Sequence, residues 1–196
     1  MDKVNKLVLA ACVAGCMTSS AWAAAPTGVD YGHGTLHFTG SVINSPCSIA
    51  PGDEDINVPL GQVANKVLET GAGYSDTYPI TIHLQNCDLT AHAGATSGTG
   101  TVDYPSFSKV SVQFAGSADA KNADLYANTG TAQGVGIRLM DTMAGNLPLT
   151  ANAASADHDL TSGDNMLKFG ARLEKNGDAV ATGTVVADVT YAMNYK

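Results

Sequence analysis

Residues Thr184–Lys196 read TVVADVTYAMNYK, and this stretch decides the fold that the sequence predicts. It contains neither glycine nor proline, and its odd-numbered positions are all apolar, namely Val185, Ala187, Val189, Tyr191, Met193 and Tyr195. Apolar residues at every second position place one face of a β-strand against a core. We therefore expect a long strand here, with an apolar face that must be covered.

Shorter alternations of the same kind come before this strand and predict an all-β sandwich of short strands. Each is expected to bury one face and expose the other, and turns rich in Gly, Asn and Asp separate them. The expected strands are residues 35–43, 79–84, 110–114, 135–139 and 167–173. Residues 65–72 have the pattern of a helical turn. The Gly/Ser/Thr-rich stretch over residues 91–104 is expected to be a surface loop.

Residues 1–23 have the three parts of a secretory signal peptide. Two lysines begin it, an apolar run over residues 7–17 follows, and small residues end it. The run is too short to span a bilayer, so we expect cleavage after Ala23 and export. Cys12 and Cys16 each end a stretch that resembles a lipoprotein processing site, and lipidation is the alternative interpretation of this segment.

Composition bounds the remaining chain to one acidic, exported domain. The sequence has 18 acidic and 10 basic residues, for a formal net charge of −8, which argues against nucleic acid or anionic membranes as partners. Two cysteines remain after cleavage, Cys47 and Cys87. An even count in an exported protein predicts one disulfide, which would contribute about 4 kcal/mol by closing a loop of about 40 residues.

Nothing in the sequence predicts catalysis, a metal ion or a cofactor. The five histidines fall in separate segments without the spacing of a metal motif such as HExxH. Asp53-Glu54-Asp55 lacks the spacing of a calcium loop and is expected to be a solvated turn. Asp157-His158-Asp159 lies in a polar stretch without a nucleophile motif. We therefore do not expect an enzyme.

Several motifs stand in a familiar order along the chain. They are GTLHFTGSVI at 34–43, NSPC at 44–47, PITIHLQNC at 79–87 and GVGIRLMD at 134–141. Gly183 stands fourteenth from the C-terminus and Tyr195 stands next to last. Together these motifs resemble the chaperone–usher fimbrial subunits, of the type 1 major pilin kind, over nearly the whole mature chain.

The resemblance implies an immunoglobulin-like β-sandwich that lacks its final strand and is completed by donor-strand exchange. A periplasmic pilus chaperone would first lend a strand, an outer-membrane usher would receive the subunit, and the N-terminal extension of an identical or related subunit would replace the chaperone. On this interpretation residues 24–39 are the donor-strand extension and residues 40–196 are the incomplete pilin domain. The subunit would pass through the periplasm to the cell-surface fimbrium.

The same resemblance points to residues for both halves of the exchange. The expected inward face of the donor strand is Gly32, Gly34, Leu36 and Phe38, because Leu36 and Phe38 are large apolar plugs. The opposite parity, Val29, Tyr31 and His33, is the alternative register, and a tail without fixed structure is an alternative for residues 24–30. The expected acceptor groove and C-terminal strand residues are Gly183, Val185, Val189, Tyr191, Met193 and Tyr195.

Two other functions compete with a shaft-forming subunit. A fimbrial subunit could carry its own adhesin surface for a glycan or host-surface receptor, and residues 91–104 would be the first place to look. Family adhesins usually have an additional lectin domain and lack the donor extension, which favours a shaft subunit here. A secreted monomeric sandwich would need a complete final strand of its own.

Overall fold

The computed structural model describes residues 32, 34–94, 96–97, 100–101 and 104–196. The expected signal peptide and most of the expected donor extension lie outside this range. The chain divides into two units, the first ending at Val42 and the second running from Ile43 to Lys196.

The predicted strand over residues 35–43 is not formed. Residues 34–43 have no strand assignment, and the side chains of Leu36 and Phe38 are 80% and 88% exposed. An extended segment becomes a strand only through hydrogen bonds with a neighbouring strand. The apolar pattern of this segment therefore predicts that it can pair with a strand, and among the described residues it pairs with none.

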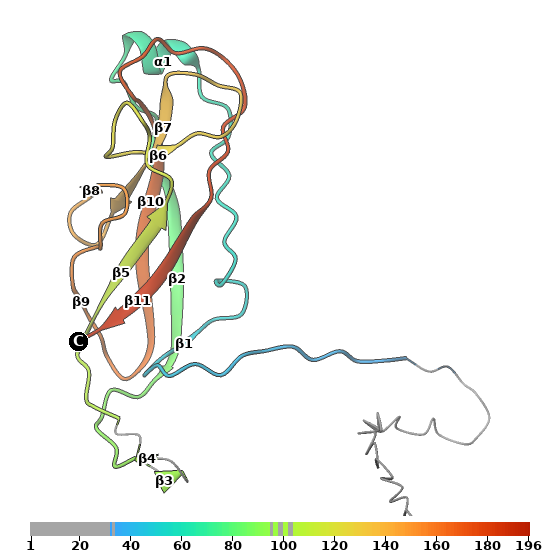
Figure 1. Cartoon of the computed structure of the whole chain (residues 1–196), viewed down its shortest axis with the longest axis vertical. Coiled ribbons are helices and arrows are strands. Elements are labelled where there is room, and N and C mark those ends of the chain that lie inside the picture. Colours follow the sequence, from blue (N-terminus) through green and yellow to red (C-terminus); the bar gives the residue numbers. More distant parts are fainter. Residues whose placement is uncertain (1–31, 33, 95, 98–99, 102–103) are drawn as a thin grey trace, which may run out of the picture. The chain divides into compact units, whose positions relative to one another are not determined.

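The second unit is an antiparallel β-sandwich, and the all-β prediction is confirmed (Figure 1). One sheet has the order β1 (Ser48–Ile49), β2 (Tyr78–Cys87), β10 (Gly163–Lys175), β7 (Val135–Asp141) and β6 (Tyr126–Ala127), and β8 (Leu147–Leu149) also pairs with β7. The other sheet has the order β11 (Val189–Tyr195), β5 (Lys109–Gly116) and β9 (His158–Asp159). A separate pair is formed by β3 (Thr96–Ser97) and β4 (Gly100–Thr101).

The expected helical turn is α1 (Asn65–Thr70), a single short helix that buries Leu68. None of the helices in the described part of the chain has the length and apolar character needed to cross a membrane.

The core lies between the two sheets, as period-two strands require. Phe114 of β5 packs edge-on against Phe169 of β10, with ring centroids 5.1 Å apart. Leu84 of β2 and Val110 and Val112 of β5 are fully buried in the same core cluster. In Figure 1 the pair β5 and β11 lies in front of β10 and β2. Each large side chain buried here stabilises the fold by about 1.5–3 kcal/mol before entropic costs.

Strand β7 departs from the predicted alternation, because all seven of its residues are buried. Its outward face is covered as well as its core face. Arg138 donates hydrogen bonds from Nε and Nη2 to the carboxylate of Glu174 at 3.3 and 3.0 Å, and from Nη1 to the main-chain oxygen of Asp124 at 3.1 Å. These bonds are what make an arginine tolerable at 8% exposure.

The predicted disulfide between Cys47 and Cys87 is present, with its Cα atoms 4.1 Å apart. Both residues are buried. The bond fixes the chain just before β1 to the end of β2, so it anchors the start of the sandwich.

His158 was expected in a polar loop, but it is buried at 7% exposure. Its Nε2 lies 2.9 Å from Oδ2 of the fully buried Asp141, which also accepts main-chain N–H bonds from Met143, Ala144 and Ala156. A buried carboxylate requires such partners. The pair joins β9 of one sheet to β7 of the other, so its role is structural.

Candidate functional site

The C-terminal strand β11 is an edge of its sheet, paired with β5 on one side. Lys196 and Lys109 exchange both main-chain hydrogen bonds, at 2.9 and 3.0 Å. Hydrogen-bonded and non-hydrogen-bonded pairs alternate along an antiparallel ladder. The N–H and C=O groups of the odd-numbered residues of β11 therefore point away from β5. In the described part of the chain, no other strand pairs with them.

The residues just before β11 do not continue the ladder, although the sequence predicted a strand from Thr184 onward. Residues 184–188 are held partly by side chains, and the N–H of Val186 donates to Oδ1 of Asn128 at 2.9 Å. A Cβ atom at Gly183 would lie 2.3 Å from the main-chain nitrogen of Ala132. Glycine is therefore required at 183 by a close approach of two backbones.

A groove with a volume of about 1000 Å³ runs beside this C-terminal segment. One wall is formed by residues 183–189 and Tyr191, and the opposite wall by residues 55–63. Side chains from both sheets form the floor, which consists of Ile80, Ile82, Phe114, Ile137, Leu139, Ala171 and Leu173. Among the described residues that line the groove, Asp55 and Asp188 carry a charge. The groove therefore suits an apolar, extended ligand.

The structure brings four of the six predicted acceptor residues to the groove. They are Gly183, Val185, Val189 and Tyr191. Met193 and Tyr195 lie farther along β11, outside the lining, and Tyr195 packs edge-on against Phe107 with centroids 5.9 Å apart. The odd-numbered residues of β11 are half-buried, and the even-numbered ones are exposed. The role of all six as acceptor residues stays a prediction.

The opposite wall, residues 55–63, was missed by the sequence reasoning. Ile56, Val58 and Leu60 alternate with exposed residues and are half-buried against the core. This short period-two pattern was the available signal. It is weak because Pro59 interrupts it, and an acidic turn comes directly before it.

The acidic turn at residues 53–55 is present but is not simply solvated. Oδ2 of Asp53 lies 2.6 Å from the main-chain nitrogen of His83 and 2.8 Å from its Nδ1. The main-chain oxygen of Asp53 accepts a hydrogen bond of 2.6 Å from the hydroxyl of Tyr191. Burial, followed by the charges of Asp53 and Glu54, raises the pKa of Tyr191, so its hydroxyl stays protonated and donates.

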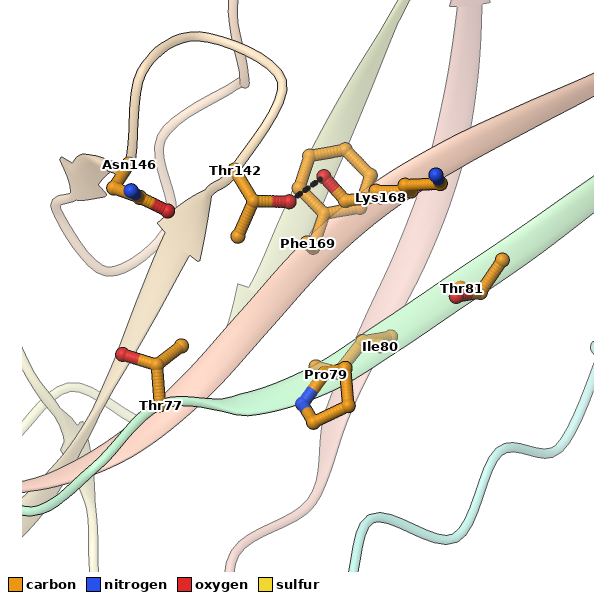
Figure 2. A pocket seen from close by; sticks show the side chains of 8 residues that line it. All are labelled: Thr77, Pro79, Ile80, Thr81, Thr142, Asn146, Lys168 and Phe169. Carbon is orange, nitrogen blue, oxygen red and sulfur yellow. Dashed lines mark hydrogen bonds between the residues drawn. The ribbon is translucent and has the colours of Figure 1, made fainter.

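A second, smaller hollow of about 240 Å³ lies between β2, β10 and the turn after β7 (Figure 2). It is lined by Thr77, Pro79, Ile80, Thr81, Thr142, Asn146, Lys168 and Phe169. The hydroxyl of Thr142 donates to the main-chain oxygen of Lys168 at 2.8 Å. This lining has no paired acid and base for catalysis. The described residues also contain no group of three His, Cys, Asp or Glu that could hold a metal ion.

The segment expected to carry an adhesin surface is described only in part. His92 forms a bridge with Tyr104, and β3 and β4 make a small hairpin between them. Residues 95, 98–99 and 102–103 lie outside the described residues. A receptor-binding role for this segment stays a prediction.

Fold and groove together define a class, a β-sandwich with an open edge strand beside an apolar groove. The family model for fimbrial proteins matches residues 36–196, and the chain belongs to this family. It is 38% identical to the fimbria A protein of Serratia marcescens, over 99% of this chain and 97% of the relative. It is 31% identical to fimbrial subunit type 1 of Salmonella typhimurium, over 92% of each chain.

Solved structures agree with this assignment. A chain in the structure of a chaperone–usher pilus, determined to explain rod uncoiling, is 25% identical, with a TM-score of 0.68, and the match covers 88% of this chain and all of that one. The P pilus rod subunit PapA, 24% identical with a TM-score of 0.59, has the same fold, matched over 78% of this chain and all of that one. The predicted immunoglobulin-like pilin fold is confirmed. The protein is a structural pilus subunit, in a family of fimbrial subunits rather than enzymes.

Proposed function

We propose that the groove accepts an extended segment of a second subunit, and that residues 24–39 of an identical or related subunit supply it. The observation that carries the proposal is the edge of β11, which no strand of the described residues pairs, beside an apolar groove. A strand inserted between β11 and residues 55–63 would pair with the outward N–H and C=O groups of β11. It would also cover the half-buried side chains of both walls.

The dimensions of the groove support a short donor strand. From Gly183 to Tyr191 the wall spans about 26 Å at roughly 3.3 Å per residue, which corresponds to a strand of about nine residues. The predicted inward set from Gly32 to Phe38 is seven residues long and fits this span. Leu36 and Phe38 are exposed, and burying both would stabilise a complex by about 3–6 kcal/mol before entropic costs.

The open edge also supports an escorted route to the surface. An unpaired apolar edge strand promotes aggregation of a free subunit. We infer that residues 1–23 direct export, and that a periplasmic pilus chaperone covers the groove until an outer-membrane usher receives the subunit. The similarity to a subunit of a chaperone–usher pilus supports this route to the cell-surface fimbrium.

Two variants, each defective in one half of the exchange, test the proposal. A chain without residues 24–39 should accept a strand but not donate one. Ala187→Arg places a charged side chain on the half-buried groove wall, so this variant should donate but not accept. Ala192→Arg, on the exposed face of β11, is the matched control and should assemble like the unmodified chain.

Electron microscopy and size-exclusion chromatography give the readout. Neither defective variant should form fibres alone, and their mixture should give a dimer of one chain of each. Fibres built by the chain without residues 24–39 would exclude this segment as the donor. Normal fibres from Ala187→Arg would exclude the groove as the acceptor.

A further inference from the structure

We propose that Tyr191, Asp53 and His83 form a clamp that holds the two walls of the groove at the spacing a donor strand needs. This inference rests on the proposed function of the groove and assigns these residues a positioning role in it.

The clamp depends on two different groups of Asp53. Its main-chain oxygen accepts the hydroxyl of Tyr191, on β11, at 2.6 Å. Its carboxylate accepts the N–H of His83, on β2, at 2.6 Å, and lies 2.8 Å from Nδ1 of the same residue. Since β11 and β2 belong to different sheets, one residue joins both sheets of the sandwich.

The position of the clamp gives it a role in the groove. Asp53 comes just before residues 55–63, which form one wall and belong to no strand. Tyr191 is the last residue of the C-terminal wall. The Tyr191–Asp53 hydrogen bond therefore ties the two walls together at one end of the groove.

The wall at residues 55–63 is not fixed by strand pairing. Without the clamp, this wall would have to become ordered when a ligand binds, and the entropic cost would lower the affinity. The clamp fixes the start of this wall beforehand. A typical hydrogen bond changes an equilibrium by about two- to twelvefold. We expect loss of the Tyr191 hydroxyl to weaken binding of a donor strand by this factor.

Binding of a synthetic peptide tests the clamp. The full chain, unfolded with its disulfide intact, is diluted at increasing concentrations into buffer with a small fixed amount of labelled peptide of sequence 24–39, and the dissociation constant is measured by fluorescence anisotropy. Tyr191→Phe keeps the ring and removes only the hydroxyl. The matched control is Tyr126→Phe, which removes a core hydroxyl that accepts the N–H of Asn152 at 3.0 Å, away from the groove lining.

Both substitutions should lower the stability of the chain by similar amounts in denaturant titrations. Only Tyr191→Phe should weaken peptide binding, by about two- to twelvefold. A double-mutant cycle with Asp53→Ala adds a readout that general destabilisation would not move. If the residues act as one clamp, the double variant should bind the peptide no more weakly than the weaker single variant.

The outcomes separate the clamp from the proposed function. If the unmodified chain does not bind the peptide, the proposed function fails and the clamp fails with it. If it binds and Tyr191→Phe binds equally well, or no more weakly than Tyr126→Phe, only the clamp is wrong. Additive effects of Tyr191→Phe and Asp53→Ala would likewise exclude a single clamp.

Discussion

Strands β7 and β11 have the same length and are both rich in apolar residues, yet the chain treats them differently. Every residue of β7 is buried, and the strand pairs with β10 on one side and with β6 and β8 on the other. Along β11, half-buried and exposed residues alternate, and the strand has a partner on one side. Within the described residues, the chain pairs both sides of β7 and leaves one side of β11 without a strand partner.

Apolar content therefore does not by itself mark a binding surface. Half-buried apolar side chains become informative when the backbone beside them is also unpaired, because one strand from another chain satisfies both. This combination occurs in β11 and in the wall at residues 55–63. It is the combination on which the proposed exchange of strands between subunits depends.

The largest expected effect comes from a substitution in the core beside β7, the region that the chain packs by itself. Phe169, on β10 next to β7, is 1% exposed and contacts Phe114. Phe169→Ala should lower the free energy of unfolding by about 3–5 kcal/mol, because a cavity replaces the ring. Denaturant titration of the chain measures this. Asn194→Ala, on the exposed face of β11, should change stability by no more than about 0.5 kcal/mol. A similar loss of unfolding free energy for both variants would contradict the distinction between the closed core beside β7 and the exposed face of β11.

A smaller effect is expected from a substitution on β11, the strand with an open edge. Val189 is half-buried in the groove wall, so Val189→Ala removes about half of the 1.6 kcal/mol that two fully buried methylene groups contribute. The chain alone should lose about 0.8 kcal/mol. A bound peptide of sequence 24–39 would bury the rest, so its affinity should fall by about fourfold.

Unfolding and peptide titrations of the same Val189→Ala sample give the two numbers. An unchanged peptide affinity would mean that Val189 does not face the donor strand. A loss of several kcal/mol in the chain alone would mean that β11 is already fully packed.

Local patterns predicted the strands because burial of one face needs only the order of residues along the chain. Residues 79–84 and 167–173 became parts of β2 and β10 for this reason. The pattern failed where distant groups intervene. The N–H of Val186 donates to the side chain of Asn128 rather than to a strand, and Glu174 allows Arg138 to be buried on the outer face of β7.

The sequence predicted one wall of the candidate groove but not the other. The C-terminal wall has a long uninterrupted alternation, so the sequence identified it. The other wall is short and contains Pro59, and nothing local indicates that it faces β11. The contact between Tyr191 and Asp53 joins residues 138 positions apart, which no periodicity reports.

The smallest expected effect is the pH dependence of stability, and it should differ between the surroundings of β7 and those of β11. Burial acts to raise the pKa of Glu174, but hydrogen bonds from Arg138 and Arg172 and the charges of both arginines outweigh it, so the pKa is lowered from its ordinary value of 4.5. The group then binds protons less readily in the folded chain than in the unfolded one. Its contribution to stability is full above pH 4.5 and is lost as pH falls through the lowered pKa.

Comparison with Glu174→Gln isolates this contribution. The difference in unfolding free energy between the unmodified chain and the variant should be constant above pH 4.5 and should shrink below it. The matched variant on the β11 side is Asp157→Asn, because a hydrogen bond from Lys196 lowers the pKa of Asp157 at an exposed site. Salt screens exposed charges far more than buried ones, so 0.5 M salt should remove the pH-dependent part for Asp157 and leave most of it for Glu174. Equal sensitivity to salt would show that the Glu174 network is as open to solvent as the Asp157–Lys196 pair.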